Sequence, residues 1–256
     1  MQFLSEKFSL NGIESDSMNI SLITFDDDVI RDFGNIYKQE MSIDRNLNGS
    51  PFYTKNLTDG DDIKLNLLFV EEDGFTPAKW TTDKVSEICN WVVSENFQPF
   101  ISYDNKNIVY YIKCTNINKK MTNSMTGYLE CSFKVFNNSA YYKNNINTEV
   151  NGTKTIEINN PSKHISSYKP IVKITNKSKK NPTLTLNGSS LTITGLPVNE
   201  TIIIDNEMKT VNSPNGDNRL SLCNRKWIHL VEGVNLLEVT GDCRVEILME
   251  IPVLYR

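Results

Sequence analysis

The sequence is dominated by an alternation of polar and apolar residues with a period of two, which is the spacing of side chains along a β-strand. Residues 183–194 (TLTLNGSSLTIT) give the clearest example, because two alternating runs flank Asn187 and Gly188. An Asn-Gly pair readily adopts the positive φ angles of a tight turn, so this segment predicts a β-hairpin. The same pattern predicts two more hairpins, in which residues 202–204 and 209–211 flank 205–208, and residues 235–240 and 244–251 flank 241–243. Short strands at this spacing indicate a β-sandwich in the C-terminal half.

One segment has helical periodicity instead. Between residues 82 and 96 the apolar side chains of Val85, Ile88, Cys89 and Val92 recur at the spacing of one helix face. Thr81 or Thr82 can cap the first turn, and residues 97–99 (FQP) end the helix because a residue before proline avoids helical geometry. The N-terminal half is therefore expected to be α+β, with candidate strands near residues 18–24, 36–43, 61–72, 99–103, 108–117 and 127–137.

The fold class predicted from these patterns is mainly β, in two domains. The 256-residue chain is long enough for two modest domains, and its Asn-rich polar stretch at residues 137–147 is the expected junction. We therefore expect a β-rich domain with one helix over residues 1–147 and a β-sandwich domain over residues 148–256.

Charge and hydropathy exclude several classes of function. The net charge is −4, which argues against broad nucleic-acid binding and against a polybasic membrane surface. No apolar run approaches the length of about 18 residues that a membrane span needs. The first residues lack the pattern of a secretory signal, so we expect a protein made in the cytoplasm with free, mostly buried cysteines. The five cysteines are Cys89, Cys114, Cys131, Cys223 and Cys243.

The motifs of enzymes are absent from the sequence. It has no G-x-S-x-G, no phosphate-binding glycine loop followed by lysine, and no H-E-x-x-H. Its two histidines, His164 and His229, have no nucleophile at a telling spacing, and Cys223, His229 and Cys243 lack the paired spacing of a zinc site. The acidic run at residues 26–28 is better explained as a solvated loop than as a calcium site. Paired carboxylates such as those at 71–73 suggest a glycosidase only weakly, because a chain with 31 acidic residues contains many such pairs. We therefore expect no catalytic residue, no cofactor and no metal.

Aromatic residues offer an alternative, a platform on which sugars stack. The candidates are Trp227, Tyr141, Tyr142 and Tyr168. Packing in a core or at a domain interface is the more common role of such side chains, and we expect it for each of them. A carbohydrate-binding module without catalysis stays open as an alternative function.

Several segments, in order, resemble the distal tail proteins of phages with long non-contractile tails. These segments are residues 8–15 (FSLNGIES), 31–34 (RDFG), the helix with Trp80, Ile88 and Trp91, residues 100–104 (FISYD), and residues 127–133 (GYLECSF) through Ala140 and Tyr141. Residues 231–241 (VEGVNLLEVTG) resemble the strand entry of the family's second domain, with Glu232 where proline is common, and Asp205 ends an aliphatic run as in the family.

This resemblance implies a structural role. Distal tail proteins form a hexameric ring through the N-terminal domain, which joins the tail tube to the baseplate or tail-fibre apparatus. The implied partners are further copies of the chain, the tail tube protein, the tail-associated hub or lysin protein, and receptor-binding or tail-fibre proteins, with DNA only in transit through the lumen. The C-terminal domain resembles a galectin-like or carbohydrate-binding sandwich. The implied location is the tail tip of the virion, and a related hub in a contractile tail or a phage-tail-like bacteriocin is the nearest alternative.

Overall fold

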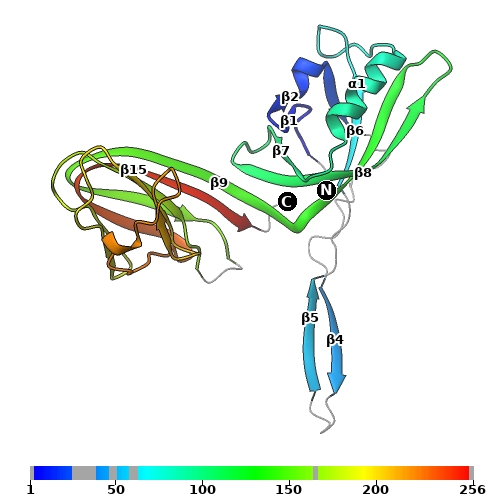
Figure 1. Ribbon diagram of the computed structural model, residues 1–256. Helices are drawn as coiled ribbons and strands as arrows, with labels where there is room; N and C mark the ends of the chain where they lie inside the picture. The colour runs from blue at the N-terminus through cyan, green and yellow to red at the C-terminus, as the bar shows by residue number, and fades with distance from the viewer. Residues whose placement is uncertain (1–2, 25–38, 46–50, 58–62, 164–166, 254–256) are drawn as a thin grey trace. The chain divides into compact units, whose positions relative to one another are not determined.

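The computed structural model describes residues 3–24, 39–45, 51–57, 63–163 and 167–253 (Figure 1). The chain divides into two compact units, one that ends at Ala140 and one that begins at Tyr141. The fold is mainly β, as predicted, and α1 (Thr82–Val92) is the α-helix of the described residues. No helix in these ranges is long and apolar enough to cross a membrane.

The N-terminal unit is an antiparallel sheet covered by α1. Its sheet runs in the order β3-β6-β9-β8-β7-β1-β2. The strands are β1 (Phe8–Leu10), β2 (Ile13–Glu14), β3 (Ile20–Ile23), β6 (Ile63–Phe69), β7 (Gln98–Ser102), β8 (Ile108–Met121) and β9 (Gly127–Asn160), and a 3-10 helix, η1 (Ser15–Met18), links β2 to β3. A separate two-stranded sheet pairs β4 (Gln39–Arg45) with β5 (Pro51–Leu57).

The helix begins as predicted and ends earlier. Thr81 caps it, because its side chain accepts a hydrogen bond from the backbone N–H of Lys84 at 3.1 Å. The buried face carries Val85, Ile88, Trp91 and Val92, which confirms the helical spacing. The expected end near residue 96 is wrong, since the backbone is already extended at residue 93, well before the proline.

Aromatic rings fill the space between helix and sheet. Phe8 stacks on Trp91 with ring centroids 5.6 Å apart and lies 5.4 Å from Phe100. The indole N–H of Trp91 donates to the backbone oxygen of Leu10 at 3.2 Å, so the helix is tied to the turn that follows β1. That turn is an Asn-Gly pair at residues 11 and 12, and both have positive φ. The sequence analysis did not predict this hairpin of β1 and β2.

All six strands predicted for the N-terminal half overlap observed strands. The Asn-rich stretch at residues 137–147 contains the division between the two units, after Ala140, but it forms a strand and not a loop. Residues 137–147 lie within β9, which runs without a break from the N-terminal unit into the C-terminal unit. The expected boundary after residue 147 therefore falls inside a strand.

The C-terminal unit encloses one continuous hydrophobic core. Around it are β10 (Ile171–Asn176), β11 (Thr183–Leu186), β12 (Ser189–Thr192), β13 (Thr201–Asp205), β14 (Thr210–Asn212), a 3-10 helix η2 (Leu220–Leu222) and β15 (Gly233–Val253). The first two predicted hairpins are confirmed as β11–β12 and β13–β14.

The third predicted hairpin is wrong, because residues 235–251 form a single strand. β15 pairs with β11 through residues 238–240 and with β10 through residues 243–248, so it changes partner at Gly241 instead of reversing. Gly241 has φ 115°, which residues with a side chain rarely adopt, and a Cβ at this position would lie 3.2 Å from the Cα of Pro182. By exchanging partners, β15 belongs to two groups of strands on the same core, as in a β-sandwich.

Candidate functional site

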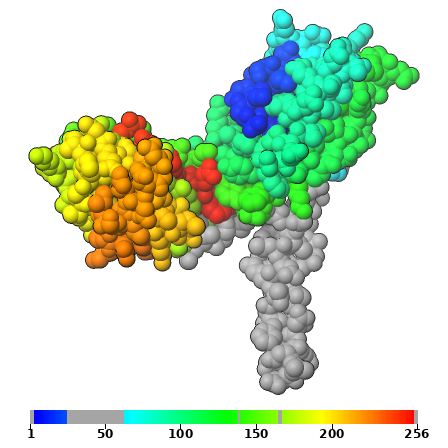
Figure 2. Space-filling model, viewed as in Figure 1, coloured from blue at the N-terminus to red at the C-terminus, as the bar shows by residue number. Residues whose placement is uncertain are grey.

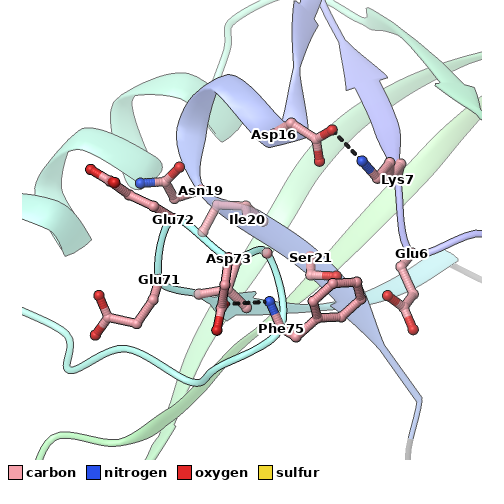
Figure 3. A pocket seen from close by; sticks show the side chains of 12 residues that line it. Glu6, Lys7, Asp16, Asn19, Ile20, Ser21, Glu71, Glu72, Asp73 and Phe75 are labelled. Atoms are coloured by element: carbon pink, nitrogen blue, oxygen red, sulfur yellow. Dashed lines mark hydrogen bonds and ion pairs between the residues drawn. The ribbon is translucent and has the colours of Figure 1, made fainter.

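The N-terminal unit carries a hollow of about 250 Å³ (Figure 3). It is formed by the segments at residues 6–21 and 70–75, which are the blue and cyan residues of Figure 2. Its lining contains five carboxylates and one ammonium group, a net charge of −4. The charged residues are Glu6, Lys7, Asp16, Glu71, Glu72 and Asp73, and Lys7 pairs with Asp16 at 2.6 Å.

One wall of the hollow is a tightly closed loop. The Asp73 carboxylate accepts hydrogen bonds from the backbone N–H groups of Phe75 and Thr76 at 2.9 and 2.8 Å, and from the Thr76 hydroxyl at 2.5 Å. These bonds, the one from the Thr76 hydroxyl most of all, hold the pKa of Asp73 below its usual value. Gly74 takes the positive φ that the turn requires, at 78°.

The loop holds an aromatic side chain in solvent. Phe75 is 79% exposed, although the backbone around it is fixed by Asp73 and by paired backbone groups of Glu71 and Thr76. Of the acidic run at residues 71–73, Asp73 is engaged in closing this loop. Sequence analysis did not single out Phe75, although the Asp-Gly pair at residues 73 and 74 is a turn signal.

A second hollow, of about 580 Å³, lies within the C-terminal unit. It is lined by Lys143, Asn145, Tyr168, Ile171, Leu248, Met249 and Glu250. Its principal charges are paired with each other, as Lys143 contacts Glu250 at 3.0 Å. The Tyr168 hydroxyl accepts the backbone N–H of Glu250 at 2.8 Å, and burial raises the pKa of Tyr168. These groups maintain the fold of this strand region.

The residues considered for catalysis or metal binding do not form a site. His229 is half-buried, and its backbone oxygen accepts a bond from the Asn187 side chain at 3.1 Å. Cys223 and Cys243 are buried, and in the described ranges no group of three His, Cys, Asp or Glu side chains is arranged to hold a metal. His164 and the acidic run at 26–28 lie outside the described residues, as does the segment at 31–34.

The aromatic candidates serve mainly as core. Tyr142, Tyr168 and Trp227 are partly buried and pack against the hydrophobic core of the C-terminal unit, and Tyr141 is also partly buried. This matches the packing role expected for them. Three of the five cysteines are buried, and burial raises the pKa of Cys243 to about 11, so the protonated thiol is favoured at neutral pH.

Family models give the decisive comparison. A model of the phage tail protein N-terminal domain matches residues 3–135, and a model of the phage tail C-terminal domain matches residues 140–249. The chain belongs to this family of phage tail proteins. The resemblance to distal tail proteins that the sequence segments indicated is thereby confirmed.

The comparison with solved structures concerns the fold alone. The chain is similar to the crystal structure of the SPP1 Dit protein, described as a paradigm of the hub adsorption apparatus in phages that infect Gram-positive bacteria, with a TM-score of 0.59 and 13% identity over 96% of this chain and 98% of that one. A chain of the phage p2 baseplate in its activated conformation with Sr gives a TM-score of 0.45 and 12% identity over 94% and 97%. No curated protein matches the sequence.

Proposed function

We propose that this phage tail protein is a structural hub of the tail tip, in which six copies form a ring that joins the tail tube to the baseplate or receptor-binding apparatus. The observation that carries the proposal is the likeness of nearly the whole chain to the fold of the SPP1 Dit hub protein. Membership of a phage tail family, through both halves of the chain, supports the same role. The role requires no catalysis.

The small sheet of β4 and β5 also favours assembly. Its strands pair over seven residues, from Gln39 opposite Leu57 to Arg45 opposite Pro51, and within the described ranges no third strand joins them. An isolated two-stranded sheet is marginally stable in water. A closed ring would let a neighbouring copy cover such an element and its edges.

We propose that the two expected domains have different roles. Residues 1–147 build the ring and contact the tail tube protein, whereas residues 148–256 face the tail-associated hub or lysin and the receptor-binding proteins. DNA passes through the lumen without being held, which suits a chain of net charge −4. The protein is made in the host cytoplasm and ends in the virion, at the tail tip.

Light scattering of the full chain at low and high salt tests the ring. Six copies of 29.2 kDa have a mass of about 175 kDa. We expect this mass, with six-fold rings in electron micrographs of the same sample. A monomer at both salt concentrations contradicts the ring. Labelling of purified virions with an antibody to the chain tests the location separately, and label away from the tail tip contradicts the hub role.

A further inference from the structure

The outer part of β8 and the start of β9 form a basic hairpin, defined here as residues 113–136. It contains four lysines and one glutamate, a net charge of +3: Lys113, Lys119, Lys120, Lys134 and Glu130. Side chains on both faces of β8 are exposed between residues 115 and 120, except for the half-buried Ile117. β7 pairs with β8 only at residues 110–112, so beyond Ile112 this edge of β8 pairs with no strand of the described chain.

The basic hairpin is held in place from one side. At its turn, the backbone and indole N–H groups of Trp80 donate to the backbone oxygens of Met125 and Gly127, at 2.9 and 2.8 Å. The backbone N–H of Thr122 donates to the oxygen of Thr126 at 2.9 Å and closes the turn. An edge strand that is open, exposed on both faces and rigidly anchored can pair with another chain at a small entropic cost.

The hollow of about 250 Å³ in the same unit, called the acidic hollow from here on, carries the opposite charge to the basic hairpin. Its net charge is −4, and Phe75 projects beside it with 79% of its surface exposed. A large apolar side chain on a fixed loop is typical of the anchor residues of protein interfaces. The opposite signs of the two surfaces favour contact between two copies and disfavour contact between two identical surfaces.

We propose that the basic hairpin of one copy docks onto the acidic hollow of the next copy, with Phe75 as the apolar anchor. This inference rests on the proposed ring. The two surfaces differ and belong to the same unit, so the contact is heterologous, as a cyclic assembly requires. The lysines bring the open edge of β8 to the carboxylates, and Phe75 loses its exposure to water in the contact.

Charge-reversed variants of the full chain test the docking by light scattering at low salt. One variant carries Glu71→Lys and Glu72→Lys, and a second carries Lys119→Glu and Lys120→Glu. We expect each alone to fall from the assembled mass to the mass of one copy. The chain that carries all four reversals again places opposite charges at the four exchanged positions, while the net charge changes from −4 to 0 on the hollow and from +3 to −1 on the hairpin. An equimolar mixture of the two variants also allows the unchanged hairpin of one to meet the unchanged hollow of the other. Both samples are expected to shift back toward the assembled mass.

A matched control carries Lys177→Glu and Lys179→Glu, which reverse two exposed charges in the C-terminal unit and should leave the mass unchanged. Phe75→Ala should weaken assembly at least about tenfold in association constant. Circular dichroism and the melting temperature verify that each variant is folded. If the wild type forms a ring whose mass the reversals do not change, the docking is overturned and the ring stands. If the wild type is a monomer, both proposals fail.

Discussion

The indole N–H of Trp80 donates to the backbone oxygen of Gly127 at 2.8 Å, and so joins the segment before α1 to the first residue of β9. Trp80 is 2% exposed, and its ring lies 5.5 Å from that of Phe69. Gly127 allows β8 and β9 to lie close together at this point, since a Cβ there would collide with the backbone oxygen of Lys120. The bond fixes the turn end of the basic hairpin.

We predict that Trp80→Phe lowers the free energy of unfolding by about 1–3 kcal/mol, because the partly buried carbonyl of Gly127 loses its donor and the buried indole loses packing. Urea titration followed by circular dichroism measures the change. Trp227→Phe is the matched control, since Trp227 is only partly buried and should cost less. Equal losses in the two variants would show that the bond to Gly127 is not the cause.

Asn235 organises the entry into β15, the segment that most resembled a distal tail protein. Its side chain donates to the backbone oxygens of Val231 and Gly233 at 2.8 and 2.9 Å and accepts the backbone N–H of Val231 at 2.9 Å. We predict that Asn235→Ala, at a site only 1% exposed, costs at least about 2 kcal/mol of stability. Thermal unfolding is the measurement, and Asn159→Ala at an exposed position of β9 should cost less than about 0.5 kcal/mol. Similar costs at both positions would contradict this role.

Local patterns in the sequence were sufficient for the hairpin at Asn187 and Gly188 and for the start of α1, because turn and cap chemistry act over a few residues. They failed at residues 137–147, where many asparagines concealed a strand. Tyr142 and Ile146 pack against the core from this stretch and are four residues apart, as an alternating strand requires. The polar composition marked the region where the units divide, after Ala140, but it did not show that the strand continues through it.

The candidate docking surfaces lay beyond the reach of sequence reasoning for a different reason. Glu6 and Glu71 line one hollow although they are far apart in the chain, and only the folded sheet brings them together. In the sequence alone, the lysines of the basic hairpin cannot be distinguished from the exposed charges of an ordinary surface strand. Their proposed role in docking depends on the edge of β8 that β7 leaves unpaired after Ile112. Strand pairing of this kind cannot be predicted from a local sequence pattern.

A comparison of Gly241 with Gly188 separates two costs of replacing glycine: the backbone strain of a positive φ and the steric contact of an added Cβ. Both have positive φ, 115° and 77°, but a Cβ at Gly241 would lie 3.2 Å from the Cα of Pro182, whereas a Cβ at Gly188 would meet nothing within 4 Å. We predict that Gly188→Ala costs about 1 kcal/mol, and that Gly241→Ala costs clearly more because contact with Pro182 adds to the backbone strain. Paired urea titrations measure the two costs. A smaller loss at Gly241 would show that contact with Pro182 adds no cost to the backbone strain.

The raised pKa of the Cys243 thiol predicts how the free energy of unfolding changes at alkaline pH. Burial, with smaller contributions from the charges of Asp242 and Glu149, raises its pKa from 9.0 to about 11 in the folded chain. The folded state therefore holds this proton more tightly than the unfolded state. Its contribution to stability is complete below about pH 9 and is lost as the pH rises through about 11.

We predict that Cys243→Ala is less stable than the wild type at neutral pH, by about 1 kcal/mol for lost packing, and that the difference shrinks as the pH approaches 11. Urea titrations at several pH values measure it. Val245→Ala is the control: Val245 is equally buried on the same strand, and it has no proton to lose. Its deficit relative to the wild type should stay constant with pH. If the Cys243→Ala deficit is just as constant, the thiol does not contribute to the alkaline loss of stability, and other groups with raised pKa values, such as Tyr168, must account for it.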